Sequence, residues 1–398
     1  MIYPLITWAL IFTFFGALIT AIFEKKYAKH AALFFSIIPL VISVFLLLNF
    51  NYNVNGYQFI EEMQWYPKYG INYKLGLDGI SLPFVFLSAV LVTVSILYSW
   101  DEERRANAFF SMLLLLDFAL IGVFAARNFI LFYIFWELVL IPMFFLIAIW
   151  GDAKKREYSS IKFLIYTHVA SVIMLVAILA MYFMSSINGE SSFDFEYIQA
   201  HTIKLPATTQ TWLFAALFFG FAVKLPTVPF HTWLPDAHVD APTAGSVILA
   251  GILLKMGGYG LIRIAIPMAP LGAEASVWAL YIFAIVSIIY GALLCLSQKD
   301  LKRLVAYSSV SHMGLVLLGF TVAIAVKNEP ANGIRQMGIV GGVFQMVAHG
   351  FISGLLFMSV GSIHHKYGTR QIGEIQGIGD KTPLIAVVLV TGSLASLG

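Results

Sequence analysis

Apolar runs of about twenty residues recur along the chain, separated by short polar stretches. Because an α-helix rises about 1.5 Å per residue, such a run can cross a hydrocarbon core of about 30 Å. The runs lack the alternation of a barrel strand, so helices are the predicted spanning elements. The pattern predicts an all-α polytopic membrane protein with eleven complete transmembrane helices, over residues 2–23, 31–50, 80–99, 108–126, 128–150, 160–185, 211–230, 243–266, 275–296, 301–326 and 337–363.

A twelfth apolar segment begins at Pro383 and reaches the last residue, Gly398. This segment is too short for a comfortable crossing and ends in VVLVTGSLASLG, without a polar or basic stop. We therefore expect the sequence to be a fragment. In the complete protein, an ionisable residue should follow within about one to two helical turns beyond Gly398.

Composition supports the membrane assignment and narrows the possible functions. The chain is 60% hydrophobic and 11% charged, with a mean hydropathy of +0.86. The net charge of +3 is too small and dispersed for a nucleic-acid-binding protein. The single cysteine, Cys295, excludes an internal disulfide and a thiolate-bound iron–sulfur cluster or zinc site made by this chain alone. No GxGxxG or Walker-type loop occurs, so an ion gradient or partner subunits must supply the energy.

The distribution of basic residues predicts the orientation. With the N-terminus on the outer side, the inner loops hold fifteen lysines and arginines and the outer side holds seven. This asymmetry agrees with the positive-inside rule. The first apolar run has no basic leading segment or clear cleavage site, so we interpret it as a retained helix.

Three ionisable residues, Glu137, Lys224 and Lys255, lie inside predicted transmembrane helices. A charge near the middle of a membrane costs at least about 2.5–3.5 kcal/mol on insertion scales, so it is rarely tolerated without a partner or a function. Two lysines and one glutamate within the membrane indicate a relay for charge, and protons are the charge we expect it to carry.

Lys224 has the most informative surroundings. Pro226 and Pro229 follow it in KLPTVPFHTWLPDAH and should break the helix inside the membrane. Broken membrane helices line cavities or are buried in protein, and they often mark ion paths. We expect the freed carbonyls of Ala222 and Leu225 to solvate the ammonium group; the alternative is a lysine that extends to the nearer membrane surface.

Glu137 is followed by Pro142, which should leave the carbonyl of Leu138 without its helical donor. This free carbonyl would lie beside the glutamate and attract water. The alternative interpretation is a helix kink with a glutamate that a neighbouring helix satisfies.

Lys255 and two histidines extend the series. Gly251 and Gly258 share the face of Lys255 and permit close approach of another helix. His312 and His349 lie in two further helices, and histidine can exchange protons near neutral pH. Each histidine alone could equally be a hydrogen-bonding core residue. The five residues together form the predicted proton relay.

Two other groups are weaker candidates. One turn holds His231, Asp236, His238 and Asp240, which could suggest a metal site. Their spacing does not match a zinc motif, so a structural loop at the inner surface is the favoured interpretation. Asp117 could join the relay, pair with a basic group such as Arg127, or be satisfied locally.

The segment KLPTVPFHTWLPDAHVDAPTAGSVILAGILLKMGGYGLIR resembles the signature of the antiporter-like subunits of respiratory complex I, and of the M-type subunit (chain 4) in particular. FWELVLIPMFFLI, QKDLKRLVAYSSVSHMG and QMVAHGFISGLLF match as well. The resemblance implies fourteen helices in the complete protein, with two inverted five-helix repeats and a broken helix in each. We expect residues 1–107 to form N-terminal helices and residues 108–398 to form the antiporter-like domain, with its second repeat incomplete.

The resemblance also implies a role for each relay residue. Glu137 matches the input-side glutamate, Lys224 the pump lysine and Lys255 the bridging lysine, while His312 and His349 match the connecting positions. The family's output glutamate lies beyond Gly398. The implied partners are the other membrane subunits of complex I in a hetero-oligomer in the bacterial inner (plasma) membrane. The chain itself is expected to hold no cofactor, whereas NAD, FMN, iron–sulfur clusters and quinone belong to partner subunits.

Two other functions remain open. Subunits of multisubunit sodium/proton antiporters and membrane-bound hydrogenases share the lysine on the broken helix, and the neighbouring genes would distinguish them. A non-conducting assembly scaffold is the third possibility, but it does not account for the buried lysines.

Overall fold

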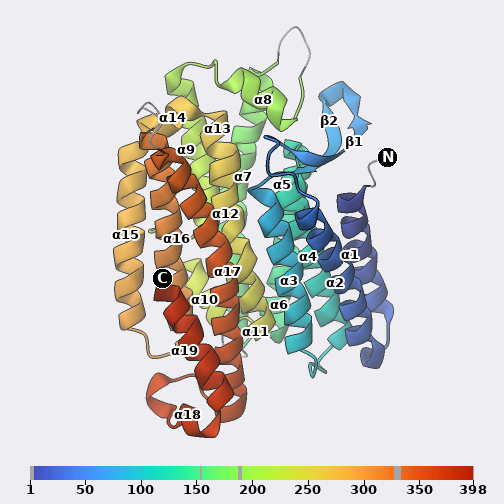
Figure 1. Ribbon diagram of the computed structural model, residues 1–398, viewed down its shortest axis with the longest axis vertical. Helices are drawn as coiled ribbons and strands as arrows, with labels where there is room; N and C mark the ends of the chain where they lie inside the picture. The colour runs from blue at the N-terminus through green and yellow to red at the C-terminus, as the bar shows by residue number, and fades with distance from the viewer. Residues whose placement is uncertain (1–3, 153–154, 187–190, 327–332, 398) are drawn as a thin grey trace.

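The computed structural model describes residues 4–152, 155–186, 191–326 and 333–397. Long helices run side by side in a bundle, with a β-hairpin at one end and the short helix α18 at the other (Figure 1). Lys154 and Lys327, which contribute to the predicted orientation, lie outside the described residues, as does Gly398.

Ten helical stretches of the described chain are long and apolar enough to cross a membrane. They are α1 (Leu5–Ile22), α2 (Lys25–Leu48), α3 (Ser81–Tyr98), α4 (Ala106–Ala125), α5 (Phe129–Leu138) with α6 (Leu140–Trp150), α7 (Arg156–Met184), the stretch Thr243–Met268, α15 (Val277–Leu296), α16 (Leu301–Ala325) and α17 (Ile334–Tyr367). The other helices are α8 (Phe195–Thr202), α9 (Ala207–Lys224), α10 (Trp233–Asp240), α14 (Pro270–Ala275), α18 (Ile378–Lys381) and α19 (Pro383–Leu397), with 3₁₀ turns η1 (Pro67–Tyr69) and η4 (Ile372–Glu374).

The one predicted span that is not among these ten stretches, residues 211–230, is a broken helix, as its prolines predict. Helix α9 ends at Lys224, and α10 begins only at Trp233. The predicted span over residues 128–150 also has an interruption, because α5 ends at Leu138 and α6 begins at Leu140. The proline at position 142 removes a helical donor at that point. The bundle is therefore interrupted beside both Glu137 and Lys224.

The stretch Thr243–Met268 forms the centre of the bundle, and 94% of its apolar window is buried. It alternates between α-helical and π-helical turns. The segments are α11 (Thr243–Ile248), the π segment η2 (Leu249–Leu253), α12 (Leu254–Gly260), the π segment η3 (Leu261–Ala265) and α13 (Ile266–Met268). Because π turns are rare and concentrate at functional sites, their presence on both sides of α12 draws attention to Lys255.

The segment 51–79, expected only as a loop, contains a two-stranded antiparallel hairpin. Strand β1 (Gln58–Tyr66) pairs with β2 (Ile71–Leu77). The connection ends at Gly70, which has a φ of 61° in the left-handed region that favours glycine. A side chain at Gly70 would also meet the backbone of Ser192, at 2.4 Å from a Cβ position. The hairpin lies outside the spanning helices (Figure 1).

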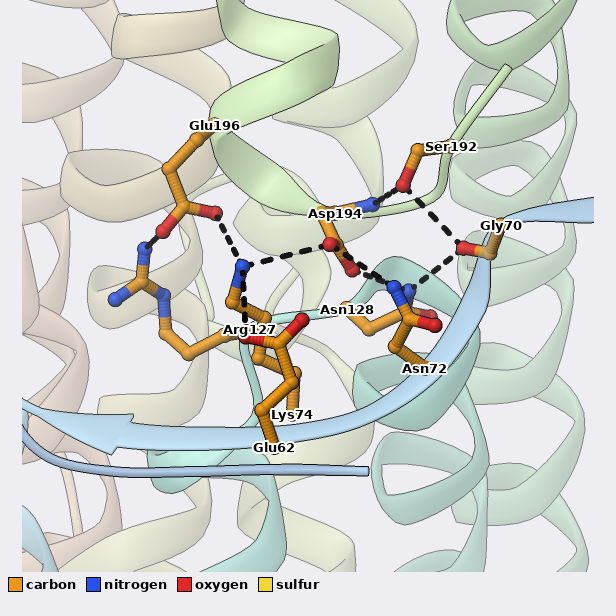
Figure 2. Close-up of polar contacts among 9 residues, drawn as sticks. All are labelled: Glu62, Gly70, Asn72, Lys74, Arg127, Asn128, Ser192, Asp194 and Glu196. Carbon is orange, nitrogen blue, oxygen red and sulfur yellow. Dashed lines mark hydrogen bonds and ion pairs between the residues drawn. The ribbon is translucent and has the colours of Figure 1, made fainter. Parts of the chain in front are cut away.

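A polar network fastens this hairpin to the start of α5 (Figure 2). The Asn128 side-chain amide donates to Asp194 Oδ1 at 2.8 Å and to the Gly70 carbonyl at 3.2 Å. Lys74 of β2 lies 3.4 Å from Asp194, while Arg127 pairs with Glu196 of α8. Since the Asn128 side chain also accepts from the backbone N–H of Ile130, it caps the helix that carries Glu137.

Candidate functional site

Lys255 lies at the centre of the bundle on α12 and is fully buried. Its Nζ donates to the carbonyl of Ala250 and contacts His349 Nδ1 of α17 at 2.7 Å. A protonated lysine can only donate, so the imidazole nitrogen accepts in that state. Lys255 and His349 therefore form a direct polar contact inside the protein.

The series continues from His349 to α16. The rings of His312 and His349 lie 5.4 Å apart between centroids. The side-chain amide of Gln345 contacts His312 Nδ1 at 2.9 Å. The structure thus brings Lys255, His349 and His312 together from three different helices, α12, α17 and α16.

Glycines allow this close approach, as the sequence predicts for Gly251 and Gly258. A Cβ at Gly350 of α17 would lie 2.9 Å from the carbonyl oxygen of Gly251. A Cβ at Gly258 would meet the Met346 sulfur. The Met346 side chain could move aside, but a backbone oxygen cannot, so the close contact of the central helix with α17 depends most on glycine at position 350.

Lys224 is the last residue of α9 and is 1% exposed. The expectation that the carbonyls of Ala222 and Leu225 solvate its ammonium group is wrong, because neither forms a hydrogen bond with Lys224 Nζ. The Ala222 carbonyl instead accepts from the backbone N–H of Thr227 at 2.9 Å. No described residue forms a hydrogen bond with Lys224 Nζ. It instead lies 5.5 Å from the Trp136 ring and 5.8 Å from the Phe163 ring, distances at which a cation is attracted to an aromatic face.

No ion pair joins the described side chains of Glu137, on α5, and Lys224. Glu137 Oε2 contacts His168 Nδ1 of α7 at 2.9 Å, and its Oε1 accepts a hydrogen bond from the Ser171 hydroxyl. The carboxylate is therefore hydrogen-bonded to α7, while Lys224 of α9 has no hydrogen-bond partner among the described residues.

The break below Lys224 packs directly against α12. A Cβ at Gly257 would lie 2.5 Å from the backbone nitrogen of Leu225 and 2.6 Å from the carbonyl oxygen of Phe221. Lys255 precedes this glycine by two residues. The two lysines thus belong to elements in backbone contact, although no hydrogen bond between the described groups connects them.

Sequence reasoning missed His168, Gln345 and Trp136, which contact the predicted residues. His168 precedes Ser171 by three positions, so both occupy one face of α7, and this spacing was the available signal. The contacts of Gln345 and Trp136 arise from helix packing, for which the sequence carries no comparable local pattern.

The turn expected at the inner surface is in part buried. His238 of α10 has no exposed surface and stacks on Phe357, with ring centroids 4.7 Å apart and an interplanar angle of 6°. Lys302 of α16 is 5% exposed and donates to the Ala241 carbonyl at 2.5 Å. Both side chains are buried because α10 packs against α7 and α16.

The acidic groups of this region have local partners. Asp236 pairs with Lys162 at 2.7 Å, and Asp240 accepts from the Ser159 hydroxyl at 2.5 Å. Asp117 is fully buried and accepts from Ser88 at 2.8 Å. Asp117 is thus satisfied at Oδ1 only, because its buried Oδ2 has no hydrogen-bond partner among the described residues. The alternative pairing with Arg127 is wrong, because Arg127 pairs with Glu196.

The fold and the buried ionisable series define a polytopic membrane protein with charged and titratable groups through its middle. A family profile described as "NADH:quinone oxidoreductase/Mrp antiporter, TM" matches residues 126–398. The chain belongs to this family.

Relatives are similar over almost the whole chain. F(420)H(2) dehydrogenase subunit M of Methanosarcina mazei is 42% identical, over 94% of this chain and 74% of its own length. NADH-quinone oxidoreductase subunit M of Rhodobacter capsulatus is 44% identical, over 93% and 71%. A chain of respiratory complex I from Thermus thermophilus with bound NADH matches with a TM-score of 0.87 at 28% identity, covering 99% of this chain and 78% of that chain. These matches confirm the predicted family and its membrane fold.

Proposed function

We propose that this chain is a proton-translocating membrane subunit of a redox-driven quinone oxidoreductase of the complex I type. Glu137, Lys224, Lys255, His349 and His312 would form its relay. The observation that carries the proposal is the buried contact of Lys255 with His349 and the proximity of His312. A scaffold has no need for three titratable groups in contact at the centre of a membrane-spanning bundle.

In the proposed cycle, charge movement in partner subunits displaces Glu137 relative to Lys224. When the carboxylate approaches, it stabilises the protonated lysine; when it withdraws, the buried ammonium loses its counter-charge and releases its proton towards Lys255. His349 and His312 would then carry the proton onward. Moving one charge against 100 mV costs about 2.3 kcal/mol, and making or breaking an ion pair at low dielectric supplies an energy of that order or larger.

The relatives support the assignment to a respiratory complex and define the partners we propose. Both relatives are M subunits of multisubunit oxidoreductases, one named for F(420)H(2) and the other for NADH. Because two such enzymes share this type of subunit, we infer that the electron donor is selected elsewhere. NAD, FMN, iron–sulfur clusters and quinone would accordingly belong to partner subunits. We place the chain in a bacterial inner membrane with its N-terminus outside, as N-terminal helices over residues 1–107 followed by the antiporter-like domain.

The second candidate is a subunit of a sodium/proton antiporter, which the family description also names. Identities of 42% and 44% to oxidoreductase M subunits favour the redox-driven complex. Genes for quinone-site and iron–sulfur subunits beside this one would agree with that choice, while genes for small antiporter subunits would reverse it.

Replacing Lys224 with alanine tests the proposal. We expect the Lys224→Ala complex to assemble but to show severely reduced proton pumping and coupled quinone reduction in membrane vesicles. Subunit content on native gels would establish assembly. Normal assembly together with full pumping would refute the role of Lys224 and favour the scaffold.

A further inference from the structure

The short segment 191–195 joins α5 to α7 at the hairpin end of the bundle. On the α7 side, the Phe193 ring stacks on Tyr182, with centroids 3.9 Å apart and an interplanar angle of 6°. The Ser191 hydroxyl also donates to the Tyr182 hydroxyl at 2.6 Å. Because Tyr182 lies in the last turn of α7, these contacts fix the segment to that end of the helix.

On the α5 side, the same segment holds the residue that caps the helix. The Asp194 carboxylate accepts from the side-chain amide of Asn128 at 2.8 Å (Figure 2). The side-chain oxygen of Asn128 in turn accepts from the backbone N–H of Ile130 at 3.1 Å. Two backbone hydrogen bonds, of 2.8 and 3.0 Å, join residues 127–129 to residues 193–195. The start of α5 is therefore bound to the segment by both backbone and side chain.

Asp194 is itself held in place by the hairpin. Asn72 donates to its Oδ2 at 3.1 Å, and Lys74 lies 3.4 Å from the same oxygen. Both donors belong to β2 (Figure 2). The Asp194 side chain is 13% exposed, and Asn128 has no exposed surface. Since hydrogen bonds to a charged acceptor are stronger than neutral ones, Asp194 is the firmest link between the hairpin and the α5 cap.

The two helices meet again at Glu137. This residue lies nine positions after Asn128 along α5, about 14 Å at 1.5 Å per residue. Ser171 lies eleven positions before Tyr182 along α7, about 17 Å by the same measure. At this depth Glu137 contacts His168 at 2.9 Å and accepts from Ser171. The spacing of α5 and α7 at the hairpin end therefore constrains the contact that Glu137 makes with α7.

The opposite end of α5 is interrupted. The helix ends at Leu138, one residue after Glu137, and α6 begins at Leu140. Residues at the ends of helices can act as hinges by absorbing changes in φ and ψ. A helix that is bound at its capped end and interrupted at its other end turns about the bound end. The contacts of Asp194 thus define the point about which the Glu137 carboxylate moves.

We propose that Asp194 is a positioning residue for the pump, which fixes the capped end of α5 through Asn128 and thereby places Glu137 against α7. Without the Asp194 carboxylate, this end of α5 is held less firmly relative to α7. Glu137 then spends less time in contact with His168 and Ser171, and charge transfer becomes poorly coupled to quinone reduction. This inference rests on the proposed function, because the position of Glu137 matters only if its charge is used.

The test compares Asp194→Ala with Glu62→Ala in the assembled complex. Glu62 is the matched control, because its carboxylate lies 3.6 Å from the same Lys74 and has no contact with Asn128 or α7 among the described residues. The measured quantity is the number of protons taken up per quinone reduced in vesicles, which does not change when a complex is only less stable or less abundant. We expect a severalfold fall for Asp194→Ala and a wild-type ratio for Glu62→Ala. A wild-type ratio in Asp194→Ala, or an equal loss in both variants, would overturn the proposal.

Exchanging the two side chains separates positioning from the loss of one contact. Asn128→Asp combined with Asp194→Asn restores an amide–carboxylate hydrogen bond with the roles reversed, and aspartate is as good an N-cap as asparagine. Asn128→Asp alone places two carboxylates together, so we expect it to lower the ratio severalfold. The double variant should return to within about twofold of the wild type. A double variant no better than either single variant would contradict the proposal, and this comparison decides the matter if Asp194→Ala does not assemble.

Electron cryo-microscopy of the assembled complex supplies the structural readout. We expect the contact of Glu137 with His168 in the wild type and in Glu62→Ala, and its loss in Asp194→Ala. An unchanged Glu137 position in Asp194→Ala would overturn the proposal. If Lys224→Ala abolishes pumping while Asp194→Ala keeps the wild-type ratio, only this inference fails. If Lys224→Ala pumps normally, the proposed function fails as well.

Discussion

Replacing Lys255 with methionine separates a relay lysine from a structural one. Methionine has a similar length and flexibility but neither charge nor donor hydrogens. Lys255 is fully buried, and its Nζ makes two contacts, with the Ala250 carbonyl and with His349. The substitution therefore removes the proton carrier while leaving most of the packing of α12 in place.

The expected effect on stability is small because two terms oppose each other. Losing two hydrogen bonds inside a membrane protein costs about 0.6 kcal/mol each on average and at most about 1.7 kcal/mol each. Removing a lysine from the middle of the membrane gains about 2.5–3.5 kcal/mol on insertion scales. With average hydrogen-bond costs the balance favours the Lys255→Met variant by about 1–2 kcal/mol, and with the maximum costs it lies between about 1 kcal/mol against the variant and about zero. The complex should therefore assemble and melt near or above the wild-type temperature.

The assay combines thermal stability of the purified complex with proton uptake by vesicles during quinone reduction. We expect unchanged or raised stability and a loss of most pumping. Met256→Leu is the matched control, since Met256 is also fully buried and this near-isosteric change usually costs less than about 1.5 kcal/mol; it should pump normally. A Lys255→Met complex that unfolds early, with pumping lost only in proportion to assembly, would show that the lysine is structural. Full pumping would refute the relay.

Substitutions at three further positions test other parts of the structure. Glu137→Gln should be nearly as damaging to pumping as loss of Lys224, and Glu137→Asp milder; equal pumping by the two variants would mean that the charge at this position is not used. Gly257→Ala should destabilise the complex by about 1–3 kcal/mol through overpacking, because its Cβ would meet the backbone at Leu225. Gly341→Ala is the control and should not destabilise it, because the space around Gly341 is open. Equal melting temperatures of the two variants would contradict this packing argument. Asn128→Ala should cost about 0.5–2 kcal/mol through loss of the α5 cap, measured as a lower melting temperature, and an unchanged temperature would show that the hairpin network does not hold α5.

Much of the fold could be predicted from the sequence because a membrane imposes a length and a polarity on every spanning helix. Two prolines after Lys224 located the break in the helix within a few residues, since proline lacks the N–H that a helix needs. The hairpin over residues 58–77 was missed because its strands lie outside the membrane and its register depends on contacts with segments distant in sequence. Gly70, for example, approaches Ser192.

The candidate site could be predicted where an ionisable residue lies inside an apolar helix. Lys224 and Lys255 stand out because charges are rare in apolar helices. His238 and Lys302 did not stand out, because their burial depends on how α10 folds back into the bundle. The pairing of Glu137 with His168, and not with an internal lysine, depends on side-chain geometry across two helices that the sequence leaves unspecified.

The central claim is that Lys224 acts by giving up a proton and not only by being charged. The Lys224→Arg variant tests this claim most directly, because arginine keeps its charge where lysine can lose a proton. The measurement is the number of protons taken up per electron delivered to quinone in vesicles with the assembled complex. The account predicts a marked fall in this ratio, while a wild-type ratio would contradict it.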